Sequence, residues 1–73
     1  MTPAELKAAR ESLGLRQSDL DRVLDLSSSY VSKMETGAKP IRTVHALAMQ
    51  ALLMGHRPED WPKDRYQQPR LSP

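Results

Sequence analysis

The fold is decided by the stretch Gln17–Gly37, QSDLDRVLDLSSSYVSKMETG, which predicts two short helices joined by a tight turn. The first helix covers residues 17–24, and its buried side is marked by apolar residues at helical spacing: Leu20, Val23 and Leu24. Asp25 and Leu26 interrupt this spacing and form the turn, because Asp tolerates a left-handed backbone better than most residues. The stretch therefore predicts a helix, a turn and a second helix.

The second helix covers residues 28–36 and is predicted to end at Gly37. Ser27 precedes it, and Ser is among the residues preferred as a helix N-cap. Val31 and Met34 form its buried side. The outward side carries hydroxyls, one aromatic ring and one cation: Ser28, Ser29, Tyr30, Ser32 and Lys33. A short helix with such a face suits the DNA major groove, which displays donors, acceptors and phosphates.

An N-terminal helix is predicted from Pro3 to about Leu13. Thr2 is its N-cap, and Glu5 three residues later completes a capping-box pattern, while Pro suits the first helical position. The apolar stripe of this helix is formed by Leu6, Ala9 and Leu13. Gly14 supplies the left-handed residue that usually ends a helix.

A fourth helix is predicted from residue 42 or 43 to Met54, after a loop that Pro40 favours. Its buried face is predicted from apolar residues at helical spacing: Val44, Leu47, Ala48, Ala51 and Leu52. Leu53 and Met54 widen the apolar surface beyond one stripe. They are either core residues or a patch that faces a partner.

The composition changes after Gly55, where four of the six prolines occur and apolar residues are few. Residues 58–61 are able to form one helical turn, which places Trp61 on the core or makes it an interface anchor. From Pro62 onward we expect an extended or disordered tail. The predicted organisation is a domain over residues 1–61 and a flexible, proline-rich tail over residues 62–73.

The composition bounds the class of protein. The 73 residues allow one small domain, and the absence of cysteine fits a cytoplasmic protein without disulfides or thiolate metal sites. Residues 1–37 hold five Lys/Arg and six Asp/Glu, whereas residues 38–73 hold six Lys/Arg and three Asp/Glu. The basic excess begins with Lys39 and Arg42, beside the second helix of the motif, as phosphate binding requires. An ordinary solvated surface accounts equally well for the charge count alone.

The pattern resembles the Cro/CI-type helix-turn-helix family of phage and bacterial regulators, also called the XRE family, over residues 3–54. The positions that carry the resemblance are Leu13-Gly14-Leu15, Gln17, Leu20, Leu24, Leu26-Ser27, Val31, Met34, Glu35 and Gly37. The resemblance implies an all-α, lambda-repressor-like bundle of four to five short helices. It implies a sequence-specific regulator that places helix 28–36 in the major groove of double-stranded DNA. The expected role is repression of a phage or mobile-element operon by a homodimer on a palindromic operator.

The resemblance also implies roles for individual residues. Base reading falls to Ser28, Ser29, Lys33 and Tyr30, although the ring of Tyr30 also fits the edge of the core. Phosphate contacts fall to Arg16, Gln17, Ser27, Ser32, Lys39 and Arg42. Arg10 and Glu35 correspond to an internal ion pair between the first and third helices. From exposed apolar content we expect a dimer interface formed by Leu53, Met54, His56 and Trp61.

Two positions depart from the family pattern, which prefers a small residue at Asp21 and Gly at Asp25. Asp25 suits a turn, whereas Asp21 either accepts hydrogen bonds from the start of the third helix or opens the helix crossing. Other chemistry finds little support, because the two histidines have no carboxylate at ligand spacing and the aspartates at 19, 21 and 25 lack the pattern of a calcium loop. We expect no enzyme, metal or cofactor. The alternative function is a protein-interaction adaptor or antitoxin that binds a partner through the fourth helix and the tail.

Overall fold

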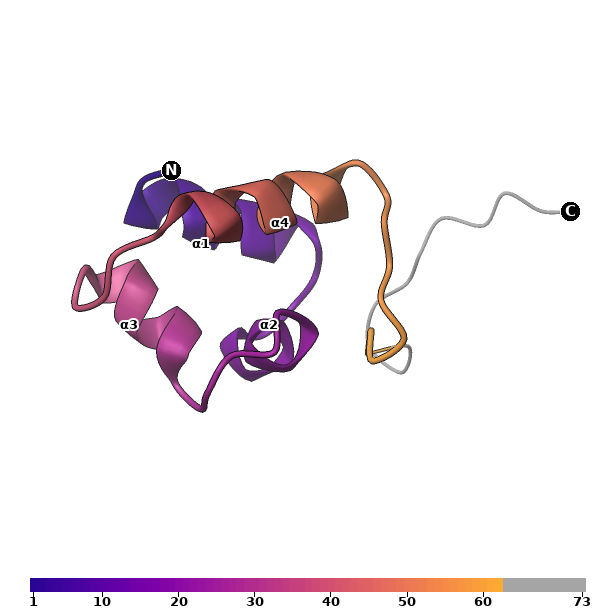
Figure 1. The fold of residues 1–73 in the computed structure, drawn as a ribbon, viewed down its shortest axis with the longest axis horizontal. Helices are drawn as coiled ribbons and strands as arrows, with labels where there is room; N and C mark the ends of the chain where they lie inside the picture. The colour runs from indigo at the N-terminus through magenta and orange to yellow at the C-terminus, as the bar shows by residue number, and fades with distance from the viewer. Residues whose placement is uncertain (63–73) are drawn as a thin grey trace, which may run out of the picture.

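The computed structural model describes residues 1–62 as an all-α bundle (Figure 1). Its helices are α1 (Pro3–Ser12), α2 (Gln17–Val23), α3 (Tyr30–Thr36) and α4 (Thr43–Leu53). Helix α3 packs against both α1 and α2, and α4 packs against α1. This confirms the predicted fold class. None of the helices within residues 1–62 has the length and apolar content that a membrane span requires.

The start of α1 is fixed by the capping box that the sequence predicted. The backbone N–H of Thr2 donates to Glu5 Oε1 (2.9 Å), and the backbone N–H of Glu5 donates to Thr2 Oγ1 (3.1 Å). Two of the amide groups that a helix N-terminus leaves without partners are thereby satisfied. The helix ends at Ser12, and Gly14 adopts the predicted left-handed conformation with φ 74°.

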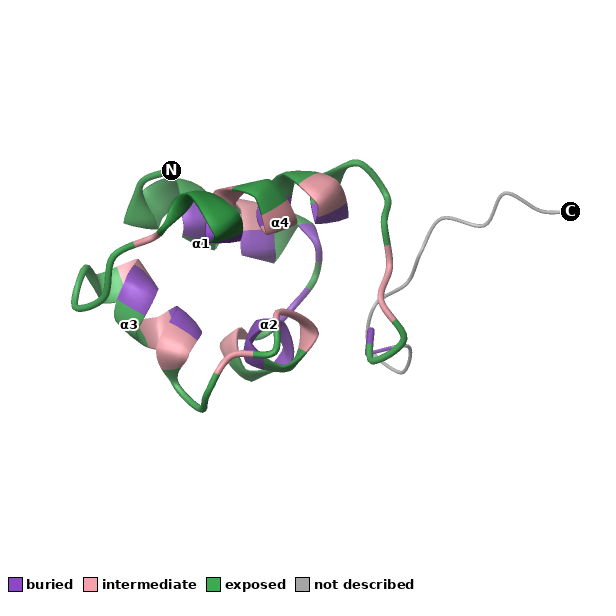
Figure 2. Ribbon diagram, viewed as in Figure 1, coloured by how far each residue is buried: buried purple, intermediate pink, exposed green. Residues whose placement is uncertain are grey.

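The core is formed where the inner sides of the helices meet, and the buried residues are the purple segments of the ribbon in Figure 2. Its buried apolar members are Leu6, Leu13, Leu15, Leu20, Val31, Met34, Met49, Leu52 and Trp61. Five of these, Leu6, Leu20, Val31, Met34 and Met49, have no exposed surface at all. Burying one such side chain contributes roughly 1.5–3 kcal/mol to the stability of the fold. Packing against this core therefore fixes the orientation of α2 and α3.

The turn between α2 and α3 is longer than the sequence predicted. Asp25 is left-handed (φ 58°), as expected, but α3 begins at Tyr30 rather than at Ser28. Ser27 does not act as a side-chain N-cap. Instead, its backbone carbonyl accepts a hydrogen bond from the N–H of Tyr30 (3.1 Å). A second left-handed residue, Ser29 (φ 68°), directly precedes the helix.

The side of α4 that faces the core matches the prediction only in part, because Leu52 is buried and Ala48 and Ala51 are half-buried as members of the predicted face. Val44 and Leu47 are 65% and 60% exposed, whereas the buried residues are His45, Met49 and Leu52. His45 is turned inward because its Nδ1 accepts a hydrogen bond from the backbone N–H of Arg42 (3.0 Å). Neighbouring residues on a helix differ by about 100° in direction, so this inward histidine rotates Val44 outward.

The segment after α4 folds back onto the core. The backbone N–H of Trp61 donates to the carbonyl of Pro58 (3.1 Å), which closes a turn, and the indole is buried. The guanidinium of Arg57 lies 4.2 Å from the centre of the Trp61 ring and donates to the carbonyl of Leu52 (2.7 Å). Trp61 is thus a core residue of the single chain. Of the predicted tail, Pro62 is buried and residues 63–73 lie outside the described part of the chain.

Candidate nucleic-acid interface

The edge formed by α2, the turn and the start of α3 carries most of the predicted base-reading residues. Ser28 and Ser29 are exposed in the turn, and Lys33 is exposed on α3. A shallow hollow at this edge is lined by hydroxyl, amide and carboxylate groups: Gln17, Ser18, Asp21, Ser28, Ser29 and Ser32. The polar residues predicted for helix 28–36 therefore gather on one edge, although two of them precede the helix.

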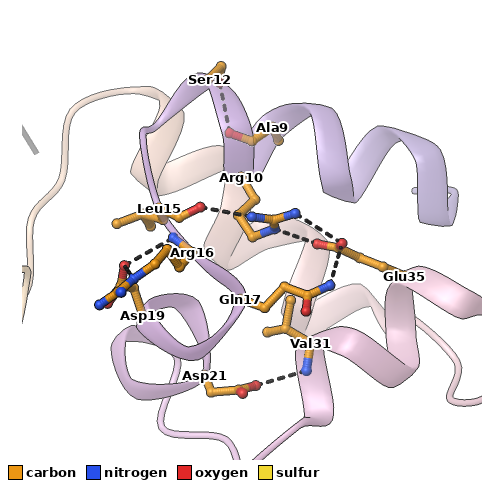
Figure 3. A network of polar contacts seen from close by, with 10 residues as sticks. All are labelled: Ala9, Arg10, Ser12, Leu15, Arg16, Gln17, Asp19, Asp21, Val31 and Glu35. Atoms are coloured by element: carbon orange, nitrogen blue, oxygen red, sulfur yellow. Dashed lines mark hydrogen bonds and ion pairs between the residues drawn. The ribbon is translucent and has the colours of Figure 1, made fainter. Parts of the chain in front are cut away.

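The carboxylate of Asp21 caps α3 from the neighbouring helix. Its Oδ2 accepts the backbone N–H of Ser29 (3.0 Å), and its Oδ1 accepts the backbone N–H of Val31 (2.8 Å; Figure 3). Asp21 is itself buried. Of the two alternatives for this residue, the structure shows the first, because it accepts hydrogen bonds from the start of the third helix. Asp21 consequently fixes the left-handed turn that presents Ser28 and Ser29.

An ion pair ties α1 to α3 behind this edge. Arg10 Nε lies 2.6 Å from Glu35 Oε2, and Arg10 Nη2 donates to Glu35 Oε1 (3.2 Å; Figure 3). Arg10 Nη1 also donates to the backbone carbonyl of Leu15 (2.8 Å). The two side chains are only 10% and 5% exposed. The structure thus contains the pair that the resemblance implied, in a bidentate geometry that favours a fixed orientation.

Glu35 is held in its charged form by this environment. Burial raises the pKa of Glu35, but hydrogen bonds from Arg10 and Gln17, with the positive charges of Arg10 and Lys7, outweigh burial. The net result is a pKa below the ordinary value of 4.5. Glu35 therefore remains ionised near neutral pH.

Gln17, the first residue of α2, is oriented by Glu35. Its amide Nε2 donates to Glu35 Oε1 (3.0 Å), as Figure 3 shows. A side-chain amide has two N–H groups, so one remains for another acceptor. The ion pair between α1 and α3 thus also fixes the side chain at the start of α2.

The start of α2 is stabilised by a residue to which sequence reasoning gave no role. Asp19 is fully buried, and its Oδ2 accepts the backbone N–H of Arg16 (3.0 Å). The guanidiniums of Arg16 and Arg22 lie within 3.5 and 3.8 Å of the same carboxylate. The signal was present, because an acidic residue three positions after the N-cap is half of a capping box.

Tyr30 is half-buried, whereas the cations predicted to bind phosphate are exposed. The ring of Tyr30 is half-buried against the core, with its centroid 5.8 Å from that of His45. Arg16, Lys39 and Arg42 are exposed. The backbone N–H of Lys39 donates to the carbonyl of Lys33 (3.1 Å), which folds the loop against the end of α3.

Comparison with known families identifies this arrangement. The profile of the family described as "helix-turn-helix domain" matches residues 4–54. The chain belongs to the helix-turn-helix domain family. This membership agrees with the resemblance to Cro/CI-type regulators and indicates a DNA-binding regulator. Neither the comparison with curated proteins nor the comparison with solved structures gave a match.

The helix-turn-helix domain includes every described residue that forms the edge around the hollow. The matched segment contains α2, the turn and α3, and it ends at Met54, the residue after α4. Trp61 and Arg57 lie beyond it, although both contribute to the fold. The family match therefore covers the candidate interface and ends before Arg57 and Trp61.

Proposed function

We propose that this helix-turn-helix domain is a sequence-specific regulator that binds double-stranded DNA through the turn 28–29 and the exposed side of α3. The observation that supports this most directly is the cap from Asp21 to Ser29 and Val31. It holds two exposed serines in a defined backbone conformation next to an exposed lysine, and reading base edges in the major groove requires such fixed donors and acceptors.

The roles within the interface follow from side-chain chemistry. Lys33 is able to donate hydrogen bonds to guanine O6 and N7. The hydroxyls of Ser28 and Ser29 both donate and accept, so they are compatible with more than one base. Tyr30 stands at the margin of this reading surface. The residues proposed to contact phosphates are Arg16, Gln17, Ser27, Ser32, Lys39 and Arg42. Phosphate contacts set the register of the protein on the duplex without reading sequence.

The regulatory role proposed is repression of its own operon in a phage or mobile element. One copy offers few base contacts, so we propose that two copies bind a palindromic operator with half-sites about 34 Å apart. Leu53, Met54 and His56 of the predicted dimer interface are exposed. Trp61 is buried within one chain and has little surface left for a second copy.

Selection of binding sites from a random duplex library tests this proposal. The wild-type protein is expected to enrich an inverted repeat. Lys33→Ala is expected to relax the preference at one base pair in each half-site, since a specific base contact is worth about 1–3 kcal/mol. Exposed Lys7 on α1 provides a matched control, and Lys7→Ala should leave the selected sequence unchanged. Selection of no sequence by a folded wild-type protein would refute sequence-specific binding.

The alternative is a protein-interaction adaptor or antitoxin, and the exposed apolar side of α4 is the observation that favours it. Salt dependence separates the two functions. If Arg16, Lys39 and Arg42 neutralise phosphates, the log–log slope of affinity against salt should be about −2.7 per copy. Removing one cation with Arg42→Ala should reduce the magnitude of the slope by about 0.9 per copy. An affinity for duplex DNA that does not respond to salt would favour the adaptor.

A further inference from the structure

His45 lies in the first turn of α4 and is one of four buried polar or charged residues within residues 1–62. The other three, Arg10, Asp19 and Asp21, hold the motif helices through the contacts described above. His45 is 8% exposed and takes part in none of those contacts. Its hydrogen bonds therefore serve a different part of the fold.

The backbone of Arg42, the residue directly before α4, is held on both sides by His45. Its N–H donates to His45 Nδ1 (3.0 Å), and its carbonyl accepts the backbone N–H groups of His45 (3.0 Å) and Ala46 (3.1 Å). A glutamate or glutamine at the third helical position supplies this kind of cap in a capping box. Arginine has no acceptor in its side chain, so it is unable to complete the box from its own side. The backbone conformation of Arg42 therefore depends on the imidazole.

The side chain of Arg42 is left for a partner outside the chain. Arg42 is exposed, and its guanidinium makes no hydrogen bond or ion pair within residues 1–62. A guanidinium presents five N–H donors in a planar fork that fits the oxygens of a phosphate. A long side chain binds such a group precisely only when the residue that carries it is itself held in place.

The same imidazole joins the start of α4 to the start of α3. Its centroid lies 5.8 Å from that of Tyr30, the first residue of α3, and the two ring planes are inclined at 52°. In Figure 1 the loop between the two helices leads from the end of α3 to the start of α4. The contact with Tyr30 therefore ties the position of Arg42 to the helix that is proposed to read DNA.

We propose that His45 is a positioning residue for DNA binding: its imidazole holds Arg42 so that the guanidinium binds one backbone phosphate of the duplex. This role rests on the proposed function, and within it His45 acts without touching DNA. Affinity for duplex DNA then depends on a hydrogen-bond acceptor at position 45, rather than on an aromatic ring or a charge at that position.

Two substitutions at position 45 separate the acceptor from the ring. His45→Gln keeps an acceptor, because glutamine at the third helical position accepts the N–H of the N-cap residue through Oε1. His45→Leu fills the buried space without an acceptor. Arg42→Ala removes the guanidinium but keeps the backbone N–H, so the cap itself remains. Arg16→Ala, which removes an exposed cation next to α2, is the matched control for Arg42→Ala.

Dissociation constants for the duplex that the wild type selects test this role, at a temperature where circular dichroism shows every variant folded. His45→Leu should weaken binding at least about tenfold per bound copy, as expected for the loss of one charged hydrogen bond. His45→Gln should stay within about twofold of the wild type. When Arg42→Ala is already present, His45→Leu should cause less than about a twofold further loss, because both changes remove the same contact. When Arg16→Ala is present instead, His45→Leu should again cost at least about tenfold.

Three results would overturn the positioning role. They are a His45→Leu variant that binds as tightly as the wild type, a His45→Gln variant that binds as weakly as His45→Leu, and a loss from His45→Leu that is equally large when Arg42→Ala is present. The last would mean that His45 acts through Tyr30 or through general stability. In each case the wild type still binds the duplex, so the proposed function stands. A folded wild type that binds no duplex would refute the proposed function and the role of His45 together.

Discussion

Replacing Arg10 with methionine is expected to destabilise the domain by about 3–5 kcal/mol, because it leaves the Glu35 carboxylate buried without its cation. The substitution removes three hydrogen bonds that the guanidinium donates, two to Glu35 and one to the carbonyl of Leu15. Methionine retains the apolar stem, so the loss is electrostatic rather than a cavity. Small domains have only about 5–15 kcal/mol of stability, so Arg10→Met should lower the urea midpoint sharply or prevent folding.

The double variant Arg10→Met with Glu35→Met separates the two contributions. When both charges of a buried pair are replaced by apolar groups, the cost is often small. The double variant should therefore recover most of the stability lost in Arg10→Met. A single variant that unfolds within about 1 kcal/mol of the wild type would show that the pair is unimportant for the fold.

The acid dependence of stability provides an independent check on the same pair. The pKa of Glu35 in the folded protein lies below its ordinary value of 4.5. A carboxyl group with a lowered pKa stabilises the fold fully above its ordinary pKa and loses that contribution as the pH falls through the folded value. When the pH is lowered below about 4.5, the urea concentration at the unfolding midpoint of the wild type should therefore decrease. The part of this decrease that comes from Glu35 should be absent in Arg10→Met.

Replacing Asp21 with alanine is expected to cost about 2–3 kcal/mol, the second largest effect. Two backbone N–H groups at the start of α3, those of Ser29 and Val31, would lose their acceptor. Loss of a helix cap costs about 0.5–2 kcal/mol, and a buried donor without a partner costs about 1–3 kcal/mol. The left-handed backbone of Ser29 would also lose the contact that holds it.

DNA affinity should fall in the same variant, because Ser28 and Ser29 would no longer be held in one conformation. Asp25→Asn is the matched control: it removes one negative charge nearby, at an exposed left-handed position that Asn tolerates. Urea unfolding and duplex binding should be measured on both variants at a temperature where both are folded. Equal stability in Asp21→Ala and the wild type would contradict the capping role, and tighter DNA binding in Asp21→Ala would show that its charge matters more than its hydrogen bonds.

Local signals predicted a large part of the fold. The capping box of Thr2 and Glu5 and the left-handed conformations of Gly14 and Asp25 depend on residues within three or four positions of one another. The ion pair of Arg10 and Glu35 spans 25 positions, and only the resemblance to a family indicated it. Spacing alone does not pair two distant charges.

The errors lie where groups from different parts of the chain meet, which local spacing does not describe. Ser27 has good N-cap chemistry, but Asp21 reaches the start of α3 from α2 and accepts the N–H groups first. The sequence of α4 supports more than one apolar face, so its spacing did not select between Val44 and Met49. In the structure the buried face is that of His45, Met49 and Leu52.

By itself, the sequence predicted the order of the four helices found within residues 1–62, because propensity, capping and apolar spacing act over a few residues. Its resemblance to a known family also indicated the helix-turn-helix fold. Only the tertiary structure decided where α3 begins, which side of α4 is buried and that Trp61 belongs to the core. These depend on groups brought together from different helices. A carboxylate eight or more positions away along the chain, such as that of Asp21, satisfies a helix end as well as a neighbouring serine does.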